Sequence, residues 1–425
     1  MIRSWSLLAV VLLVSCTKTS SKYCGLHPED TATCPTPDAA VTTCTTSDDC
    51  TATPETLVCN ATSGTCVECD QASSQTAACT GTDPVCGDDQ VCRGCRAHAE
   101  CASGACLPDG SCGTDETVAF VDGSAPGTSA SCTQAAPCRR ISEGLVAGPP
   151  RLFIKVSNTV VENLSINDRN ITILASPGAR LASTQNTILQ VSGSSRVVIH
   201  DLEIGATVAS PTLGVDVNAS TGSLTLHHVR VINNSTAGIR ANAGTLNVYR
   251  STIADNLGGG IHVRNSAAGY DIRNNFIHSN GRGSTSNATL YGGLLLEQVV
   301  GRAEYNTVAF NECDGLQNRA GIACYGLSSS ATGNIVFGNR EGFVALDSTQ
   351  ASGNCTFGTT LKLGMGDLGF ANPNPTSPDL HLTVASPSSV RDAGGACEAT
   401  NPEDIDGNPR PYGLGCDLGA DELTP

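Results

Sequence analysis

The side chains best suited to acid–base chemistry gather in one part of the chain. Glu312 and Asp314 lie close together, and Arg282 lies in an earlier loop-forming stretch. Cleavage of a polysaccharide needs two facing carboxylates, or a carboxylate-bound Ca²⁺ with an Arg or Lys base. These three residues are therefore the catalytic candidates. The competing interpretation, a solvated loop whose charges form surface ion pairs, is favoured because such pairs are common on protein surfaces.

The same region contains groups that could bind a ligand without cleaving it. Residues 281–292 and 312–320 supply a ring face, amides and guanidinium groups, which suit the hydroxyl groups of a sugar. The candidate ligand-binding residues are Arg282, Asn287, Tyr291, Gln317, Asn318 and Arg319. Because binding usually sits on loops held by a rigid scaffold, we predict contact with a polysaccharide or cell-surface glycan here.

A repeated motif indicates what scaffold holds these loops. Between residues 220 and 345 the chain repeats an Asn followed by a Gly, and each Gly-to-next-Asn interval is 18, 20, 18 or 18 residues. The Asn-to-Gly intervals vary instead, at 4, 4, 13, 10 and 3 residues. The repeated residues are Asn234, Asn256, Asn280, Asn311 and Asn339, with Gly238, Gly260, Gly293, Gly321 and Gly342. A fixed interval with all slack in one turn is typical of a stacked solenoid.

The segments between the turns alternate as strands do. A β-branched residue lies three positions before each Asn, and a period of two runs through Ser223–Val231 and Thr245–Ile253. We predict an all-β chain, a right-handed parallel β-helix in which the Asn side chains stack from coil to coil while tolerating a left-handed backbone. His200, His227, Tyr249 and Arg273 then share an outward column, which predicts a solvent-facing role without catalysis or metal binding.

Cysteines divide the chain into two regions. Fourteen of the 22 Cys lie between Cys24 and Cys112, where aromatic residues are scarce, so covalent links must replace a conventional core. Zinc at the CxxC pairs Cys66–Cys69 and Cys92–Cys95 is the weaker alternative. Disulfide candidates elsewhere are Cys132, Cys138, Cys313, Cys324, Cys397 and Cys416, with Cys313 and Cys324 expected to tie the second long turn.

The negative net charge of the chain restricts which molecules it can bind. The chain carries a net charge of −16, and residues 24–130 contribute 16 acidic side chains against Arg93 and Arg96. This balance excludes a nucleic-acid partner, since no basic stripe is available for phosphates. We expect no metal and no cofactor; calcium at the pairs Asp48–Asp49 and Asp88–Asp89 is the alternative to solvated charge.

The N-terminus resembles that of an exported lipoprotein. Arg3 precedes an apolar run, and Leu13-Val14-Ser15-Cys16 matches the bacterial lipoprotein box. The resemblance implies cleavage before Cys16 and lipidation of its thiol, and Thr17 implies transfer to the outer membrane on its periplasmic or surface side. The lipid would be the only membrane attachment.

Residues 117–423 resemble secreted parallel β-helix proteins of the pectin-lyase-like superfamily. The residues that carry this are the opening Val118–Gly127, the stretch Ala136–Leu145, and the ending Asp379–Leu382, Ser386–Gly394, Asp404–Pro411 and Asp417–Glu422, which is similar to bacterial choice-of-anchor-type regions. The superfamily includes polysaccharide lyases and hydrolases, and chains without known activity. Its hydrolases would imply an adjacent Asp-Asp, a Gly-His and an Arg-x-Lys, and none occurs between residues 160 and 360.

We therefore expect five segments: a signal peptide (1–15), a lipid-anchored, acidic Cys-rich stalk (16–116), an N-terminal cap (117–160), the β-helix coils (161–360) and a C-terminal cap region (361–425). The expected function is non-catalytic binding or adhesion to glycans or the cell envelope. A polysaccharide lyase or glycoside hydrolase is the alternative. We expect a monomer, because capped β-helices hide their end strands.

Overall fold

The computed structural model describes residues 44–50, 58–60, 62–71, 79–127, 129–148, 150–183, 185–206, 212–265, 269–282, 291–314, 319–341, 344–346, 349–364, 366–397 and 401–424. The chain divides into two compact units. One comprises Met1–Arg96 with Pro108–Ser111, and the other comprises Ala97–Leu107 with Cys112–Pro425. The second unit contains the β-helix. Within the described residues, no helix is long and apolar enough to span a bilayer.

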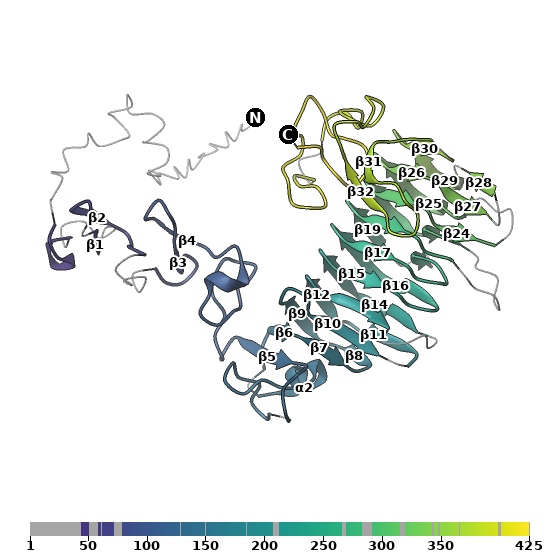
Figure 1. Cartoon of the computed structure of the whole chain (residues 1–425). Coiled ribbons are helices and arrows are strands. Elements are labelled where there is room, and N and C mark those ends of the chain that lie inside the picture. The colour runs from purple at the N-terminus through teal and green to yellow at the C-terminus, as the bar shows by residue number, and fades with distance from the viewer. Residues whose placement is uncertain are drawn as a thin grey trace, which may run out of the picture. The chain divides into compact units, whose positions relative to one another are not determined.

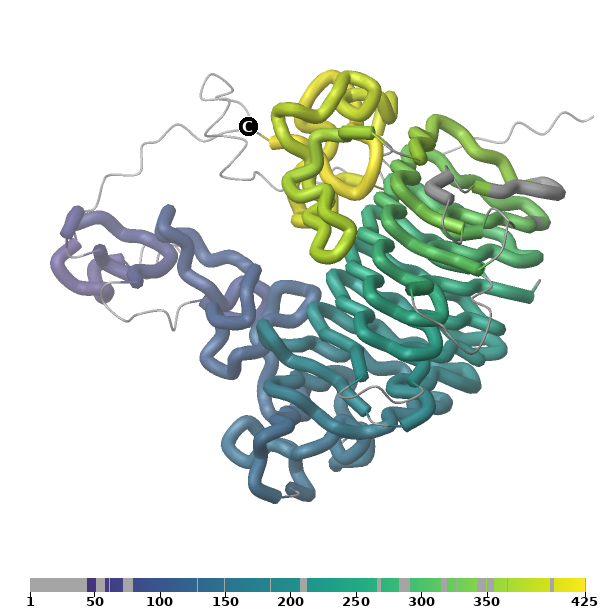
Figure 2. Tube along the Cα trace, turned by 45° about the vertical axis from the view of Figure 1, so that its right-hand side comes forward, coloured from purple at the N-terminus to yellow at the C-terminus, as the bar shows by residue number. Residues whose placement is uncertain are grey.

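The second unit is the predicted right-handed parallel β-helix, with three faces of stacked parallel strands (Figures 1 and 2). Face A consists of β8 (Leu164–Asn167), β11 (Thr187–Ser192), the starts of β14 (Leu213–His227) and β16 (Ala237–Tyr249), β18 (Ile261–Arg264), β21 (Leu294–Glu297) and the starts of β25 (Ile322–Thr332) and β29 (Thr349–Phe357). Face B consists of β5 (Val118–Asp122), β6 (Phe153–Ser157), β9 (Asn170–Ala175), β12 (Arg196–His200), the ends of β14 and β16, β19 (Gly269–Arg273), β22 (Val300–Glu304) and the ends of β25 and β29.

Face C is a nine-stranded sheet. Its strands are β7 (Thr159–Val161), β10 (Arg180–Ser183), β13 (Glu203–Ala206), β15 (Arg230–Ile232), β17 (Thr252–Ala254), β20 (Phe276–His278), β23 (Thr307–Ala309), β26 (Ile335–Phe337) and β30 (Leu361–Leu363). The long turns of the sequence follow this face, and there β24 (Glu312–Cys313) pairs with β27 (Asn339–Glu341), which pairs in turn with β28 (Val344–Leu346).

The interior is built from stacked aliphatic side chains. The β-branched residues expected three positions before each repeated Asn are all fully buried in one cluster, namely Val231, Ile253, Ile277, Val308 and Val336. They pair in register across face C. Because branched side chains have few rotamers in a strand, stacking them costs little conformational entropy while it buries apolar area.

The repeated Asn residues form the predicted ladder, which is fully buried. The Nδ2 group of Asn234 donates to Oδ1 of Asn256 at 2.8 Å, and the same contact continues from Asn256 to Asn280 at 2.9 Å. It extends to Asn311 at 2.9 Å and to Asn339 at 3.0 Å. The Oδ1 atoms of the four later members, from Asn256 to Asn339, also accept the backbone N–H of the Asn on the preceding coil. The ladder therefore satisfies buried turn groups between coils.

The residues with a left-handed backbone at this corner are not the repeated Asn residues that the sequence had predicted. The left-handed residues are those that precede the ladder: Asn233, Asp255, Ser279, Phe310 and Gly338 have φ between 56° and 61°. The ladder Asn residues themselves are not in this region. The amide contacts thus fix the turn, while the preceding residue absorbs the change of direction.

A second, unpredicted ladder lies between faces B and C. Asn275 donates from Nδ2 to Oδ1 of Asn306 at 2.9 Å, and Asn306 donates to Asn334 at 3.1 Å. Ser251 begins this column, because its N–H donates to Oδ1 of Asn275. Each member lies five residues before a member of the first ladder. That constant offset is visible in the sequence.

The repeated Gly residues are required by close approach. A Cβ on Gly238 would lie 2.7 Å from the carbonyl oxygen of Gly260 and 2.8 Å from Nδ2 of Asn256. A Cβ on Gly293 would lie 2.6 Å from the carbonyl oxygen of Gly321. The Gly column therefore leaves room for the Asn ladder of the next coil. Gly342 lies outside the described residues.

The start of the β-helix contains the expected strand, loop and short helix: β5, the loop at Gly123, and α2 (Ile141–Val146). The disulfide Cys132–Cys138 lies in the same region. Ile141, Cys132 and Cys138 are buried against the first coils.

The C-terminal segment lies against the outer surface of face C beside the later coils, in yellow in Figure 2. It contains the antiparallel pair β31 (Phe370–Asn372) and β32 (Asp379–Leu382) and the disulfide Cys397–Cys416. Phe276, Phe310 and Phe337 project from face C into a second apolar core, where they meet Leu380 and Leu418. This segment therefore packs along one side of the coils.

The Cys-rich region consists of short disulfide-linked modules. In residues 44–66, Cys44 pairs with Cys59 and Cys50 with Cys66, around η1 (Ser47–Cys50) and the hairpin β1 (Val58–Asn60)–β2 (Thr65–Val67). In residues 69–92, Cys69 pairs with Cys86 and Cys79 with Cys92, with the hairpin β3 (Val85–Cys86)–β4 (Cys92–Arg93). Both modules link the first Cys to the third and the second to the fourth. The CxxC cysteines are thus disulfide-bonded, which excludes the zinc interpretation for them.

A third set of four cysteines follows. Cys101 pairs with Cys112, and Cys95 and Cys106 are also disulfide-bonded. Near them lie η3 (His98–Glu100) and an antiparallel bridge between Cys106 and Cys112. The predicted replacement of an apolar core by disulfides is confirmed in these described residues.

Candidate functional site

The two long turns leave the same corner on adjacent coils, as predicted. At their described ends the N–H of Gly292 donates to the carbonyl of Arg319 at 2.9 Å, and that of Gly293 donates to Ala320 at 2.7 Å. Asn287, Gln317 and Asn318 lie outside the described residues. The proposed binding role of these three residues stays a prediction.

The described members of the predicted site make contacts within the chain. Arg282 donates to the carbonyls of Pro375 at 2.8 Å and Phe310 at 3.1 Å. Its Nε lies 3.5 Å from Oε1 of Glu312, and the Asp314 side chain is exposed. The turn thus brings Arg282 and Glu312 together as a partly exposed ion pair. Arg282 also donates a hydrogen bond to Pro375 of the C-terminal segment.

Tyr291 and Arg319 are also engaged. The Tyr291 side chain is only 7% exposed and packs on His262, with ring centroids 5.3 Å apart. It therefore does not present a ring face to a ligand. Arg319 donates from Nε to the Tyr325 hydroxyl at 2.8 Å and lies over that ring.

The prediction that Cys313 and Cys324 form a disulfide at the second long turn is wrong. Cys324 pairs with Cys355, because Cys324 on β25 and the β29 strand that carries Cys355 stack on adjacent coils. Cys313 is a buried free thiol, and burial raises its pKa to about 12. The disulfide thus links successive coils and leaves the turn untied.

A different set of side chains converges on face B. His200, His227, Tyr249 and Arg273 occupy equivalent positions on β12, β14, β16 and β19, and we call them the face B column. The His200 and His227 rings stack with centroids 4.9 Å apart and planes 7° apart. The Tyr249 ring follows at 5.1 Å, and the Arg273 guanidinium lies 5.0 Å from its centroid.

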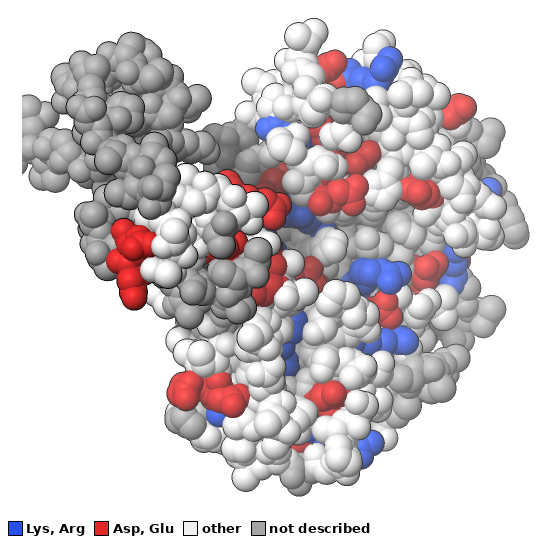
Figure 3. All heavy atoms as spheres, turned by 60° about the vertical axis from the view of Figure 1, so that its left-hand side comes forward, with Lys and Arg blue, Asp and Glu red and all other residues white. Residues whose placement is uncertain are grey.

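Charged side chains continue the column on the next strands. The Tyr249 hydroxyl donates to Oδ2 of Asp271 at 3.1 Å, and the same carboxylate lies 2.7 Å from Arg273 and 3.2 Å from Arg302. Arg302 also lies 3.7 Å from Glu304. Two acids and two arginines thus meet within ion-pair distance on one face. Figure 3 shows acidic and basic side chains lying side by side on the surface of the β-helix.

The rings of the column are neutral at ordinary pH. Burial lowers the pKa of His227 to about 4, and it also lowers the pKa of His200. Burial raises the pKa of Tyr249. Each neutral imidazole then offers one donor and one acceptor nitrogen. Because the ring faces contact one another, the edges carry these polar atoms.

Lys155 lies in line with the column, two strands before His200. It is 5% exposed, and its Nζ has no hydrogen-bond partner among the described residues. Apolar neighbours of the same column, Phe120 and Leu174, contribute to the cluster that buries it. Burial lowers the Lys155 pKa to about 7. Nearby, burial and then the Lys155 charge lower the pKa of His98, whose Nδ1 accepts the Cys106 N–H at 3.1 Å.

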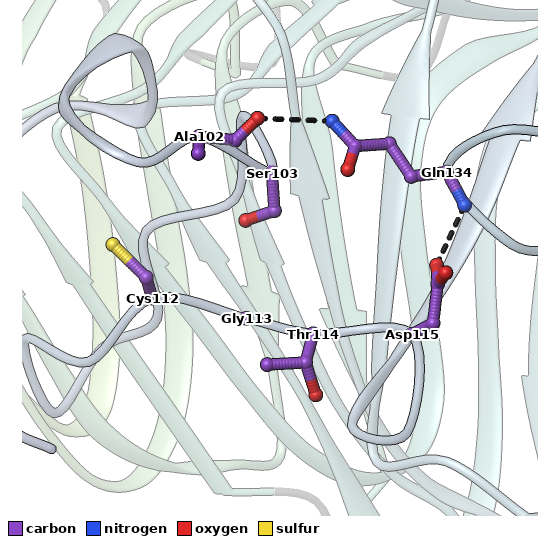
Figure 4. Close-up of a pocket in the computed structure, with 7 residues that line it drawn as sticks. All are labelled: Ala102, Ser103, Cys112, Gly113, Thr114, Asp115 and Gln134. Carbon is purple, nitrogen blue, oxygen red and sulfur yellow. Dashed lines mark hydrogen bonds between the residues drawn. The ribbon is translucent and has the colours of Figure 1, made fainter.

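A hollow of about 390 Å³ lies close to this end of the β-helix (Figure 4). Its lining residues are Ala102, Ser103, Cys112, Gly113, Thr114, Asp115 and Gln134. Gln134 spans it, with its side-chain amide donating to the Ala102 carbonyl at 3.0 Å and its N–H donating to Asp115 at 2.6 Å. Since Asp115 is the only titratable side chain in the lining, the hollow offers no acid–base pair.

Sequence reasoning located the face B column but interpreted it as solvent-facing polar residues. The alternation correctly predicted that the side chains point outward. It could not indicate that they stack on one another, because ring contacts depend on strand register between coils. The convergence of Asp271, Arg302 and Glu304 was likewise missed, although these residues also occupy neighbouring positions in the repeat.

Comparisons with known proteins concern parts of this architecture. A family of unknown function (DUF8331) matches residues 46–118, which include the Cys-rich modules. No curated protein matches the chain. Among solved structures, the crystal structure of pectate lyase Pel9A is similar to 78% of this chain and 100% of its own, with a TM-score of 0.47 and 12% sequence identity. The parallel β-helix itself follows from the strand register of the described coils.

Proposed function

We propose that this protein is a non-catalytic, glycan-binding β-helix whose binding surface is the face B column. The observation that carries the proposal is the row of ring edges at His200, His227 and Tyr249, spaced by successive strands. A neutral imidazole both donates and accepts, as a sugar hydroxyl does, so adjacent rings match adjacent hydroxyls. The rigid coils hold the rings in place before binding, which limits the entropy lost on association.

The charges on this face favour a neutral or weakly acidic glycan. Asp271 and Glu304 balance Arg273 and Arg302, so the face carries no excess positive charge for a polyuronate. Arginines in such a network are already paired, and releasing one to bind an acid group would leave a buried carboxylate without a partner.

We further propose that the protein is exported and attached to the outer membrane by a lipid on Cys16. The disulfides of the Cys-rich region support an oxidising compartment. The Cys-rich region would then serve as a spacer between the lipid and the β-helix. Radiolabelled palmitate should be incorporated by the wild-type chain and not by the Cys16→Ser variant.

A polysaccharide lyase is the second candidate, because two acids and two arginines meet at Asp271, Arg273, Arg302 and Glu304. A lyase needs an Arg or Lys base near the sugar. Incubation with polyuronates, with and without Ca²⁺, should yield no unsaturated product. Product formation that is lost in Arg302→Gln would establish the lyase instead.

A glycan array followed by calorimetric titration tests the binding proposal. His227→Gln and Tyr249→Phe should each weaken binding by about tenfold, because the first replaces a rigid, stacked imidazole edge with a flexible amide and the second removes the hydroxyl. The matched control is His228→Gln. His228 is the next residue, but it lies in the turn and its Nδ1 contacts Asp201 at 2.7 Å.

The control should bind as the wild type does. If His227→Gln and Tyr249→Phe bind normally, the proposal is wrong. If Arg319→Ala alone abolishes binding, the binding surface belongs to the long turns.

A further inference from the structure

His381, Asp406 and Asp421 come from three separate parts of the C-terminal segment and converge on its surface. One potential ligand atom from each lies within 4.8 Å of the others. His381 belongs to β32, Asp406 to the turn after Asp404, and Asp421 to the last described stretch. Contacts between residues so far apart in the chain are set by the tertiary fold.

The imidazole is held in the orientation that a metal ligand needs. Its Nδ1 contacts the carboxylate of Asp379, and its ring packs edge-on against Phe276 with centroids 5.0 Å apart. Nε2 therefore points toward Asp406, whose Oδ2 lies 3.2 Å away. A carboxylate on the far ring nitrogen fixes the tautomer and is the usual outer support of a metal-bound histidine.

Asp421 supplies an independent reason for a bound cation. It is only 5% exposed, and it makes no ion pair within 4.0 Å among the described residues. Within the described part of the chain, its carboxylate accepts one hydrogen bond, from the N–H of Leu382 at 2.6 Å. A buried carboxylate without a cationic partner is costly, and the single imidazole nearby already contacts Asp379 and Asp406.

We propose that His381, Asp406 and Asp421 bind a divalent transition-metal ion of the Zn²⁺ type. One imidazole nitrogen with two carboxylates is a donor set that Zn²⁺ accepts, whereas Ca²⁺ prefers a larger shell made of oxygen alone. The ion would neutralise Asp421 and connect β32, the 404–408 turn and the C-terminal stretch. Its role would be to hold this segment on face C, independently of any glycan bound to face B.

The test uses the full chain with its disulfides intact, purified without a histidine tag and stripped of metal with a chelator. Titration with Zn²⁺ should show one site per chain and raise the melting temperature. Asp406→Asn keeps the shape of a side chain that is 51% exposed, so the variant should fold, and it should weaken Zn²⁺ binding at least tenfold. His381→Gln should abolish the melting shift.

The matched control is again His228→Gln, since His228 contacts Asp201 but belongs to no such three-residue group among the described residues. It should bind Zn²⁺ as the wild type does. Absence of saturable Zn²⁺ binding in the wild type would overturn the proposal. Wild-type affinity in both Asp406→Asn and His381→Gln would overturn it equally, because the ion would then lie elsewhere.

Discussion

At the scale of single residues, Lys155 lies in an unfavourable environment for a charged side chain. Its amine is buried among apolar side chains, and its lowered pKa of about 7 reflects the cost of desolvating the charge. The neutral amine still lacks a hydrogen-bond partner. The buried amine of Lys155 therefore lowers the stability of the folded protein.

Lys155→Met should raise the free energy of unfolding at neutral pH by roughly 1–3 kcal/mol, because it replaces an unsatisfied amine with an apolar side chain of similar length. Denaturant unfolding measures the change. The control is Lys362→Met, since Lys362 lies over the Phe357 ring and is partly exposed, and its stability change should be small. A loss of stability in Lys155→Met would show that the amine has a partner.

Two partly buried histidines, His227 and His278, make the stability of the protein depend on pH. Burial lowers the pKa of both His227 and His278 from 6.5 to about 4. Between these values the unfolded chain binds more protons than the folded one, so stability is full above pH 6.5 and is lost as the pH falls toward 4. Melting temperatures across this range should decline. His278→Gln should make the decline shallower, and an unchanged slope would contradict the assignment.

At the scale of elements, the two Asn ladders hold the turns that close each coil. Asn280 donates to the Ile253 carbonyl and to Asn311, while its Oδ1 accepts two hydrogen bonds from Asn256. Truncation of one ladder residue therefore leaves several buried groups on neighbouring coils without partners.

Asn280→Ala should destabilise the protein by about 3 kcal/mol for this reason. Asn247→Ala is the matched control, because Asn247 faces outward on β16 and makes one described hydrogen bond, to Thr225. Its loss should cost less than about 1 kcal/mol. Equal effects in the two variants, measured by denaturant unfolding, would mean that the ladder is not a main source of stability.

The later coils are linked covalently as well. Peptide mapping without reduction should recover Cys324 joined to Cys355 and Cys313 as a free thiol. Because burial raises the Cys313 pKa to about 12, an alkylating reagent should modify it only after unfolding. Modification of Cys313 in the native protein, or a Cys313–Cys324 peptide, would contradict the structure.

The sequence predicted those features that repeat and missed those that do not. The Asn234 column, the buried β-branched residues and the corner of the long turns follow from the intervals between repeats. The packing of Phe276 against His381 could not be predicted, because the C-terminal segment has no period that relates it to the coils. The disulfide order within the Cys-rich modules also needs the fold, since spacing alone permits several pairings.

At the scale of the whole molecule, the β-helix is a rigid support whose sides carry different chemistry. The later strands of face C, β20, β23, β26 and β30, pack against the C-terminal segment in an apolar core, whereas face B carries the stacked rings and the charged network. Face C thus makes stabilising contacts, and face B makes the proposed ligand contacts. The proposed zinc site lies in the segment that packs on face C, and the proposed glycan site lies on face B.

A crystal structure of the protein soaked with an oligosaccharide selected on the array tests the central claim most directly. We predict sugar density on face B, with hydroxyl groups within hydrogen-bond distance of His227 and Tyr249. Density confined to the turns at residues 281–292 and 312–320, with face B empty, would contradict the account.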